Sequence, residues 1–113
     1  MTKKKPKPTR YKIWMRPAVH ATRKKLPGDI RQRVKRTIDQ LMEKPRPPHS
    51  KELELPDNVS SSIRSEWEVR RVRLEDWRIV YGISEHWQEI AILTIQKRPP
   101  YDYEDLEMLI SEL

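Results

Sequence analysis

The chain has 113 residues, enough for one compact domain and too few for two. It contains no cysteine, which excludes disulfides and thiolate metal sites, and no apolar run approaches the roughly 20 residues that a membrane span needs. Its net charge of +7 favours a polyanionic partner. We therefore expect a cytoplasmic protein that does not enter a membrane, and no pattern in the sequence indicates a cofactor.

The charge is distributed unevenly along the chain. Residues 1–51 hold 17 Lys and Arg against 3 acids, whereas residues 52–113 hold 7 against 14. The basic half suits a polyanion, although an excess of lysine can also serve only to keep a small protein soluble. Residues 1–10 are rich in Lys and Pro and predict a disordered basic arm. We expect residues 11–113 to form a single domain.

The first predicted elements are a strand and a helical hairpin. Residues 11–16 alternate in the period of a half-buried strand, and Pro17 suits the first turn of a short helix that ends at Pro27. We expect Asp29 to cap a second helix. The apolar residues of that helix recur at helical spacing: Ile30, Val34, Ile38 and Leu41.

A long connection and three strands follow the hairpin. Residues 44–62 are rich in proline and serine and predict irregular structure. Strands are predicted over residues 67–73, 77–84 and 88–97, the last apolar on both faces and therefore central in its sheet. Residues 104–113 predict an acidic amphipathic helix. The predicted fold class is α+β, with an N-terminal strand and helical hairpin packed on a small antiparallel β-sheet and a C-terminal helix.

The densest group of unusual residues is the arginine cluster of the predicted hairpin: Arg71, Arg73 and Arg78. Side chains alternate along a strand, so Arg71 and Arg73 share a face and Arg70 points the other way. We expect a two-residue turn to set Arg71 opposite Arg78 and a four-residue turn to set Arg73 opposite Arg78. Either turn gathers all three guanidinium groups on one face, whereas a three-residue turn sends Arg78 to the other.

Like charges at close range repel, so three clustered arginines indicate a ligand rather than a folding device. The fixed fork of donors on a guanidinium matches phosphate oxygens and suits a developing phosphorane. The alternative is an ordinary salt-bridged surface. Its acidic partners would be Glu66, Glu68, Glu75 and Asp76.

A second polar cluster follows the last predicted strand. It contains Lys97, Arg98, Tyr101 and Tyr103. A tyrosine there can stack on an unpaired base or handle a proton, or it can simply pack at the boundary between strand and helix. The three histidines are scattered without the spacing of metal ligands, so we expect no metal site.

Several segments of the sequence resemble the RelE/ParE superfamily of bacterial type II toxins. They are YKIWMRP, IDQLMEKPRP leading to SKELEL, and WEVRRVRLEDWRIVYGI followed by EIAILTIQKR. The resemblance extends from Tyr11 to about Tyr103. For the RelE-like branch it implies an endoribonuclease that cleaves mRNA on the ribosome without metal, by attack of the substrate's own 2′-hydroxyl. It also implies a cognate antitoxin protein as partner.

The resemblance implies a role for each basic residue. Arg71 and Arg78 would neutralise the phosphorane and Arg73 would assist them. Arg98 would hold phosphate, and Tyr101 or Tyr103 would position or stack on the substrate. Lys51 and Lys97 would contact RNA, and together with the tyrosines they are the candidates for accepting the 2′-hydroxyl proton, because arginine is a poor base.

Two departures from the nuclease pattern favour other functions. The turn contains Leu74-Glu75-Asp76 where the family often has Gly-Asp, and Val69 is apolar where RelE-like nucleases often have a base. These departures leave open a ParE-like toxin that binds and inhibits DNA gyrase and is not a nuclease. A plain nucleic-acid-binding module without toxicity is a third hypothesis.

Overall fold

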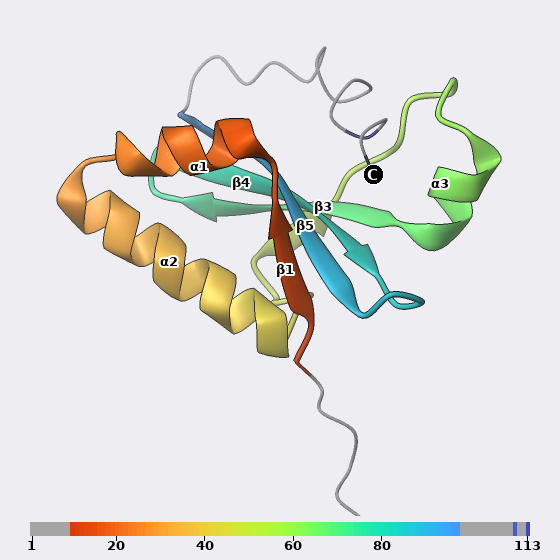
Figure 1. The fold of residues 1–113 in the computed structure, drawn as a ribbon, viewed down its shortest axis with the longest axis horizontal. Helices are drawn as coiled ribbons and strands as arrows, with labels where there is room; N and C mark the ends of the chain where they lie inside the picture. Colours follow the sequence, from red (N-terminus) through yellow and green to blue (C-terminus); the bar gives the residue numbers. More distant parts are fainter. Residues whose placement is uncertain (1–9, 98–109, 111–112) are drawn as a thin grey trace, which may run out of the picture.

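The computed structural model describes residues 10–97 together with Ile110 and Leu113. Within this part of the chain, a five-stranded sheet has the order β1-β5-β4-β3-β2 (Figure 1). The elements are β1 (Lys12–Met15), α1 (Pro17–Lys24), α2 (Gly28–Glu43), β2 (Ser50–Glu52), α3 (Ser61–Glu66), β3 (Glu68–Leu74), β4 (Trp77–Ser84) and β5 (Glu89–Lys97).

The sheet is mixed, which corrects the antiparallel sheet expected from sequence. β3, β4 and β5 form an antiparallel meander and β2 pairs antiparallel with β3, but β1 pairs parallel with β5. Short turns force neighbouring strands to alternate in direction. No short turn joins β1 to β5, so the sequence left the direction of β1 undetermined.

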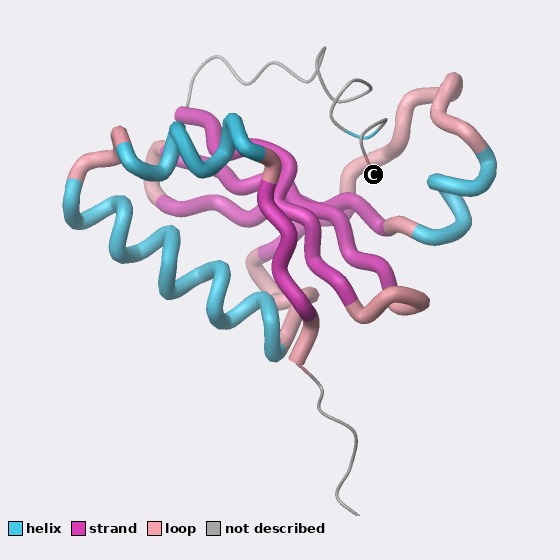
Figure 2. The backbone as a smooth tube through the Cα atoms, viewed as in Figure 1, coloured by secondary structure: helices cyan, strands magenta, loops and turns pink. Residues whose placement is uncertain are grey.

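The helical hairpin covers one face of the sheet, as Figures 1 and 2 show. The prediction of its apolar stripe is confirmed, because Ile30, Val34, Ile38 and Leu41 are all buried. The prediction for Asp29 was wrong. α2 begins at Gly28 after Pro27, without a side-chain cap, and Asp29 lies in its first turn. A carboxylate there still interacts favourably with the positive end of the helix.

The connection after α2 contains two short elements that the sequence did not predict. β2 has three residues and adds an edge strand beside β3. α3 has six residues, and the hydroxyl of Ser60 caps it by accepting a hydrogen bond of 3.3 Å from the backbone N–H of Ile63. Elements this short show too few residues for a periodic signal.

The two faces of the sheet carry separate apolar clusters. One lies between the sheet and the helical hairpin, and the other lies on the opposite face around Trp67, Val69, Val80 and Leu93. β5 contributes to both, which confirms its predicted central position. Most of the predicted helix over residues 104–113 lies outside the described residues. Its Ile110 and Leu113 are described, and both belong to the second cluster.

Candidate functional site: the basic face of the sheet

The turn between β3 and β4 fixes the positions of the arginines. Leu74 pairs with Trp77, so the loop has two residues, and the next pair along the hairpin is Arg73 opposite Arg78. Arg71 pairs with Val80. The prediction that all three arginines share a face is confirmed by this register. The predicted partner was wrong, because a two-residue loop here sets Arg73, and not Arg71, opposite Arg78.

The turn itself contains a residue in an unusual conformation. Glu75 has φ of 54°, in the left-handed region at the first loop position, where hairpins with two-residue loops commonly place glycine. Its carboxylate forms an ion pair with Arg33 of α2. The sequence therefore lacks the glycine that usually indicates such a turn, although the two-residue turn is present in the structure.

Residues from the flanking strands extend the arginine face on both sides. Lys51 of β2 pairs with Arg71, and Gln96 and Thr94 of β5 pair with Arg78 and Val80. Lys51, named from the family resemblance, thus lies beside the arginines. We call this set the basic face: Lys51, Arg71, Arg73, Arg78, Thr94 and Gln96. Thr94 and Gln96 were missed from sequence, although the alternation of β5 could have found them.

The cationic side chains of the basic face differ in how far they are exposed. Arg78 is only 3% exposed, Arg71 is half-buried, and Arg73 and Lys51 are exposed. The second apolar cluster lies on the same side of the sheet, because Val69 and Val80 share the parity of Arg71 and Arg78. A ligand phosphate at this face would meet exposed cations first and a buried guanidinium below them. Low exposure strengthens such charge-assisted contacts.

The remaining predicted site residues do not join the basic face in the described structure. Lys97 pairs with Trp77, which places it by parity on the opposite side of the sheet from Arg78. This position counts against Lys97 as an RNA contact or base at the same site. Arg98, Tyr101 and Tyr103 lie outside the described residues, and their roles stay predictions.

The acidic residues near the basic face form ion pairs with arginines outside it. Glu68 accepts hydrogen bonds from Arg46 at 2.9–3.0 Å and from Arg70 at 2.6 Å, and Glu75 forms an ion pair with Arg33.

Arg70 also donates a hydrogen bond to the hydroxyl of Ser50 at 2.9 Å, and its cross-strand partner is Tyr81 of the helix-covered face. The prediction that Arg70 points to the other face from Arg71 and Arg73 is therefore confirmed. The salt-bridged alternative describes Arg70 and not Arg73, which forms no ion pair within the described residues.

The other end of the hairpin carries a paired charge network. Arg46 lies 2.9 Å from carboxylate oxygens of both Glu68 and Glu85, and the Tyr11 hydroxyl donates to Glu85 at 2.7 Å. Partial burial tends to raise the pKa of Glu68, but hydrogen bonds from Arg46 and Arg70 outweigh it and hold that pKa below its usual value. The hydrogen bond from Tyr11, together with Arg46, lowers the pKa of Glu85.

Comparisons with known proteins agree with this fold. The model of the family described as the ParE toxin of type II toxin–antitoxin systems, parDE, matches residues 13–98. A chain in the archaeal RelE–RelB complex from Pyrococcus horikoshii superposes with a TM-score of 0.67 at 22% identity, covering 80% of this chain and 98% of that one. For the isolated E. coli RelE toxin the TM-score is 0.61 at 16% identity, covering 90% and 97%.

A third similar structure is the intact E. coli RelBE toxin–antitoxin complex, with a TM-score of 0.60 at 18% identity, covering 78% of this chain and 96% of that one. No curated protein sequence matches the chain. Fold and family match together define a toxin of a type II toxin–antitoxin system. The chain belongs to the ParE toxin family, within the RelE/ParE superfamily that its sequence motifs resemble.

Two other features are absent from the described residues. None of the helices there is both long and apolar enough to cross a membrane. No group of three or more His, Cys, Asp or Glu side chains in that part of the chain is arranged to hold a metal ion.

Proposed function

We propose that this toxin acts in the cytoplasm as an endoribonuclease that cleaves mRNA on the ribosome, and that the basic face is its site. The observation that carries the proposal is the register of the hairpin. It sets Arg73 directly opposite Arg78, and Lys51 directly opposite Arg71, on one face. Directly opposed like charges destabilise a sheet, so a polyanionic ligand gives this arrangement its function.

The proposed chemistry is transfer of a phosphoryl group within the substrate. The 2′-hydroxyl of a ribose gives its proton to a base, and the 2′-oxygen attacks the adjacent phosphorus. The bond from phosphorus to the 5′-oxygen breaks, and a proton returned to that oxygen leaves a cyclic phosphate and a 5′-hydroxyl. Arg71 and Arg78 would stabilise the charge that develops on the equatorial oxygens, with Arg73 assisting at the exposed rim. Lys51 adjoins Arg71 and is the described candidate for the group that accepts the 2′-hydroxyl proton.

The proposed partner is a cognate antitoxin. The family is defined by type II toxin–antitoxin systems, and two of the similar structures are toxin–antitoxin complexes. We expect the antitoxin to suppress toxicity when the two proteins are produced together. The second candidate function is inhibition of DNA gyrase without RNA cleavage. The family match to ParE toxins, rather than any geometry of the site, favours it.

Induced expression in bacteria, with mapping of mRNA 5′ ends, separates these functions. We expect growth arrest together with new 5′ ends inside codons, and we expect Arg71→Ala and Arg73→Ala each to reduce cleavage at least about tenfold, since each removes a charge-assisted phosphate contact. Arg31→Ala is the matched control, because this exposed arginine lies on α2, on the other side of the sheet.

Thermal unfolding of each variant establishes that it remains folded. Growth arrest with intact mRNA and induced DNA damage would select gyrase inhibition instead. Unaltered cleavage in both arginine variants would show that the basic face is not the site.

A further inference from the structure

Gln96 of β5 carries a polar atom that the fold leaves without a partner. Its side-chain oxygen Oε1 is buried and accepts no hydrogen bond from any described residue. The side chain as a whole is only half-buried, so part of its carboxamide remains accessible to a ligand. A buried carbonyl oxygen without a donor costs free energy, and nearly all such groups in folded proteins find one. A donor supplied by a bound ligand would remove that cost.

The position of Gln96 places this oxygen within the basic face. Gln96 is the direct cross-strand partner of Arg78, which on its other side is opposite Arg73, so the three residues form one row across β5, β4 and β3. Directly opposed side chains on one face have Cβ atoms about 5 Å apart. A nucleotide whose phosphate lies at Arg78 therefore has its sugar and base within reach of Gln96.

The polar residues that β5 contributes to the basic face are neutral. Thr94 and Gln96 follow the apolar residues Ala91 and Leu93 on the same side of the sheet. A hydroxyl and an amide add no charge to attract phosphate, but they match the donors and acceptors on the edges of bases. The basic face is therefore divided into a cationic part on β2, β3 and β4 and a neutral polar part on β5.

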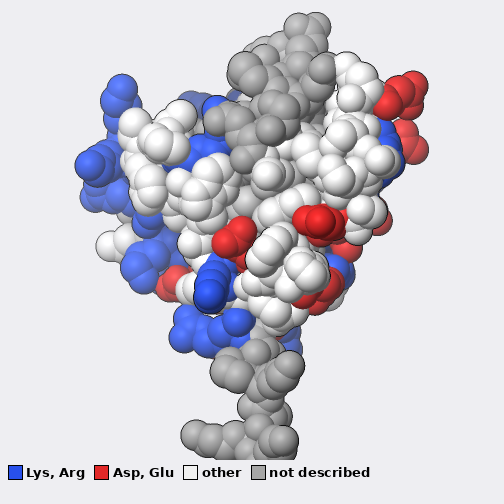
Figure 3. Space-filling view, turned by 45° about the vertical axis from the view of Figure 1, so that its right-hand side comes forward, with Lys and Arg blue, Asp and Glu red and all other residues white. Residues whose placement is uncertain are grey.

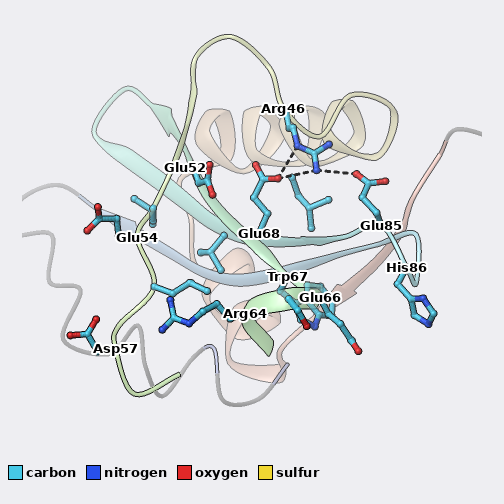
Figure 4. Close-up of a pocket in the computed structure, with 15 residues that line it drawn as sticks. Arg46, Glu52, Glu54, Asp57, Arg64, Glu66, Trp67, Glu68, Glu85 and His86 are labelled. Carbon is cyan, nitrogen blue, oxygen red and sulfur yellow. Dashed lines mark hydrogen bonds and ion pairs between the residues drawn. The ribbon is translucent and has the colours of Figure 1, made fainter. Parts of the chain in front are cut away.

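A large cleft at the end of the sheet away from the β3–β4 turn does not suit a nucleotide. Its volume is about 850 Å³, and its acidic residues outnumber Arg46 and Arg64: Glu52, Glu54, Asp57, Glu66, Glu68 and Glu85. Figure 3 shows acidic groups gathered toward the α3 side of the molecule and basic ones toward the helical hairpin. In Figure 4, Arg46 lies between Glu68 and Glu85 and pairs with both. The remaining negative charge repels RNA and leaves the basic face as its binding surface.

We propose that Gln96 selects adenine at a nucleotide that flanks the scissile phosphate. Its Oε1 accepts a hydrogen bond from the N6 amino group of adenine and its Nε2 donates one to N7, which is the paired contact that glutamine forms with this base. Unstacked bases of single-stranded RNA present this edge to proteins. On the same edge guanine has only the acceptors O6 and N7, so it would face Oε1 with a second acceptor. The inference rests on the proposed function of the basic face and adds the sequence preference of cleavage.

Mapping of mRNA 5′ ends after induction of the full chain tests this preference. At each of the two nucleotides that flank the cut, the frequency of every base is compared with its frequency in uncut transcripts. We expect the parent to cut beside adenine at least about fivefold more often than beside guanine at one of these positions, because a bidentate contact gives discrimination of that order. The ratio is internal to each sample, so a change in stability or expression does not alter it.

Two substitutions at Gln96 change the ratio in different directions. Gln96→Met keeps the length of the side chain and removes both hydrogen-bonding groups, so the ratio should fall to about one. Gln96→Arg should move the preference to guanine, because a guanidinium pairs with O6 and N7. Gln32→Met, at an exposed position on α2, is the matched control and should keep the parental ratio.

The outcomes separate this inference from the proposed function. Cleavage without a parental preference for adenine, or with the same preference in Gln96→Met, would overturn the inference and leave the nuclease intact. An adenine preference retained by Gln96→Arg would overturn it as well, and this second variant decides the matter if Gln96→Met fails to fold. Absence of cleavage by the parent would overturn the proposed function itself, and the inference with it.

Discussion

The two ends of the β3–β4 hairpin differ in how their charged side chains are paired: like charges meet at one end and opposite charges at the other. At the turn end Arg73 stands opposite Arg78, and Lys51 stands opposite Arg71. At the open end Arg46 bridges Glu68 and Glu85. At the open end, ion pairs join segments that are far apart in sequence. At the turn end, like charges lie opposite one another. Electrostatic cost and electrostatic gain are thus separated along one hairpin, and the proposed ligand-binding face lies at the end where like charges meet.

Removing one arginine from each end gives the largest contrast in stability. Arg46→Met leaves Glu68 and Glu85 without their shared cation and should lower the free energy of unfolding by about 1 kcal/mol, a figure already reduced for the exposure of these groups. Arg73→Met should change it by no more than about 0.5 kcal/mol, because it removes a like-charge neighbour and, among the described residues, no ion pair.

Urea denaturation measures both variants against the parent, and for about 1 kcal/mol we also expect a fall of roughly 4–8 °C in the midpoint of thermal unfolding. Equal losses in the two variants would remove the distinction between the ends. A larger loss for Arg73→Met would reverse it.

Acid titration of stability sharpens the same contrast. The pKa values of Glu68 and Glu85 are lowered in the folded state, so these groups stabilise the fold above their unfolded pKa near 4.5. That contribution is lost as the pH falls through the lower folded values, where both carboxylates become protonated. We expect the urea midpoint to fall below about pH 5, less steeply in Arg46→Met than in the parent. Arg73→Met should keep the parental slope, and a flattened slope in that variant would contradict the assignment.

The sequence predicted features that depend on local periodicity. Ile30, Val34, Ile38 and Leu41 form the buried stripe of α2, and the apolar run of β5 lies in an interior strand, between β1 and β4. The shared face of the arginines followed from alternation along two strands. These patterns repeat within a few residues, so a single segment contains the whole signal.

Features set by distant or individual contacts were not predictable. Arg46 and Glu85 meet across 39 positions, and nothing in either neighbourhood indicates the other. The parallel direction of β1 depends on how the helical hairpin returns the chain. The pairing partner of Arg78 depends on the loop, and Glu75 adopts a positive φ without being glycine. Glu75 helps to set the register of the site through this turn, yet its residue type gives the least indication of the conformation it adopts.

That residue gives the smallest predicted effect. Glu75→Gly should raise the free energy of unfolding by a few tenths of a kcal/mol, since relief of the left-handed conformation, roughly 1 kcal/mol, is partly offset by loss of an exposed ion pair with Arg33 and by added chain entropy in the unfolded state. Asp76→Gly, at the loop position without a positive φ, should lower it by about 0.5 kcal/mol. Urea denaturation of the pair measures the difference. If both glycines destabilise equally, Glu75 is not strained, and a different loop geometry would have to bring Arg73 opposite Arg78.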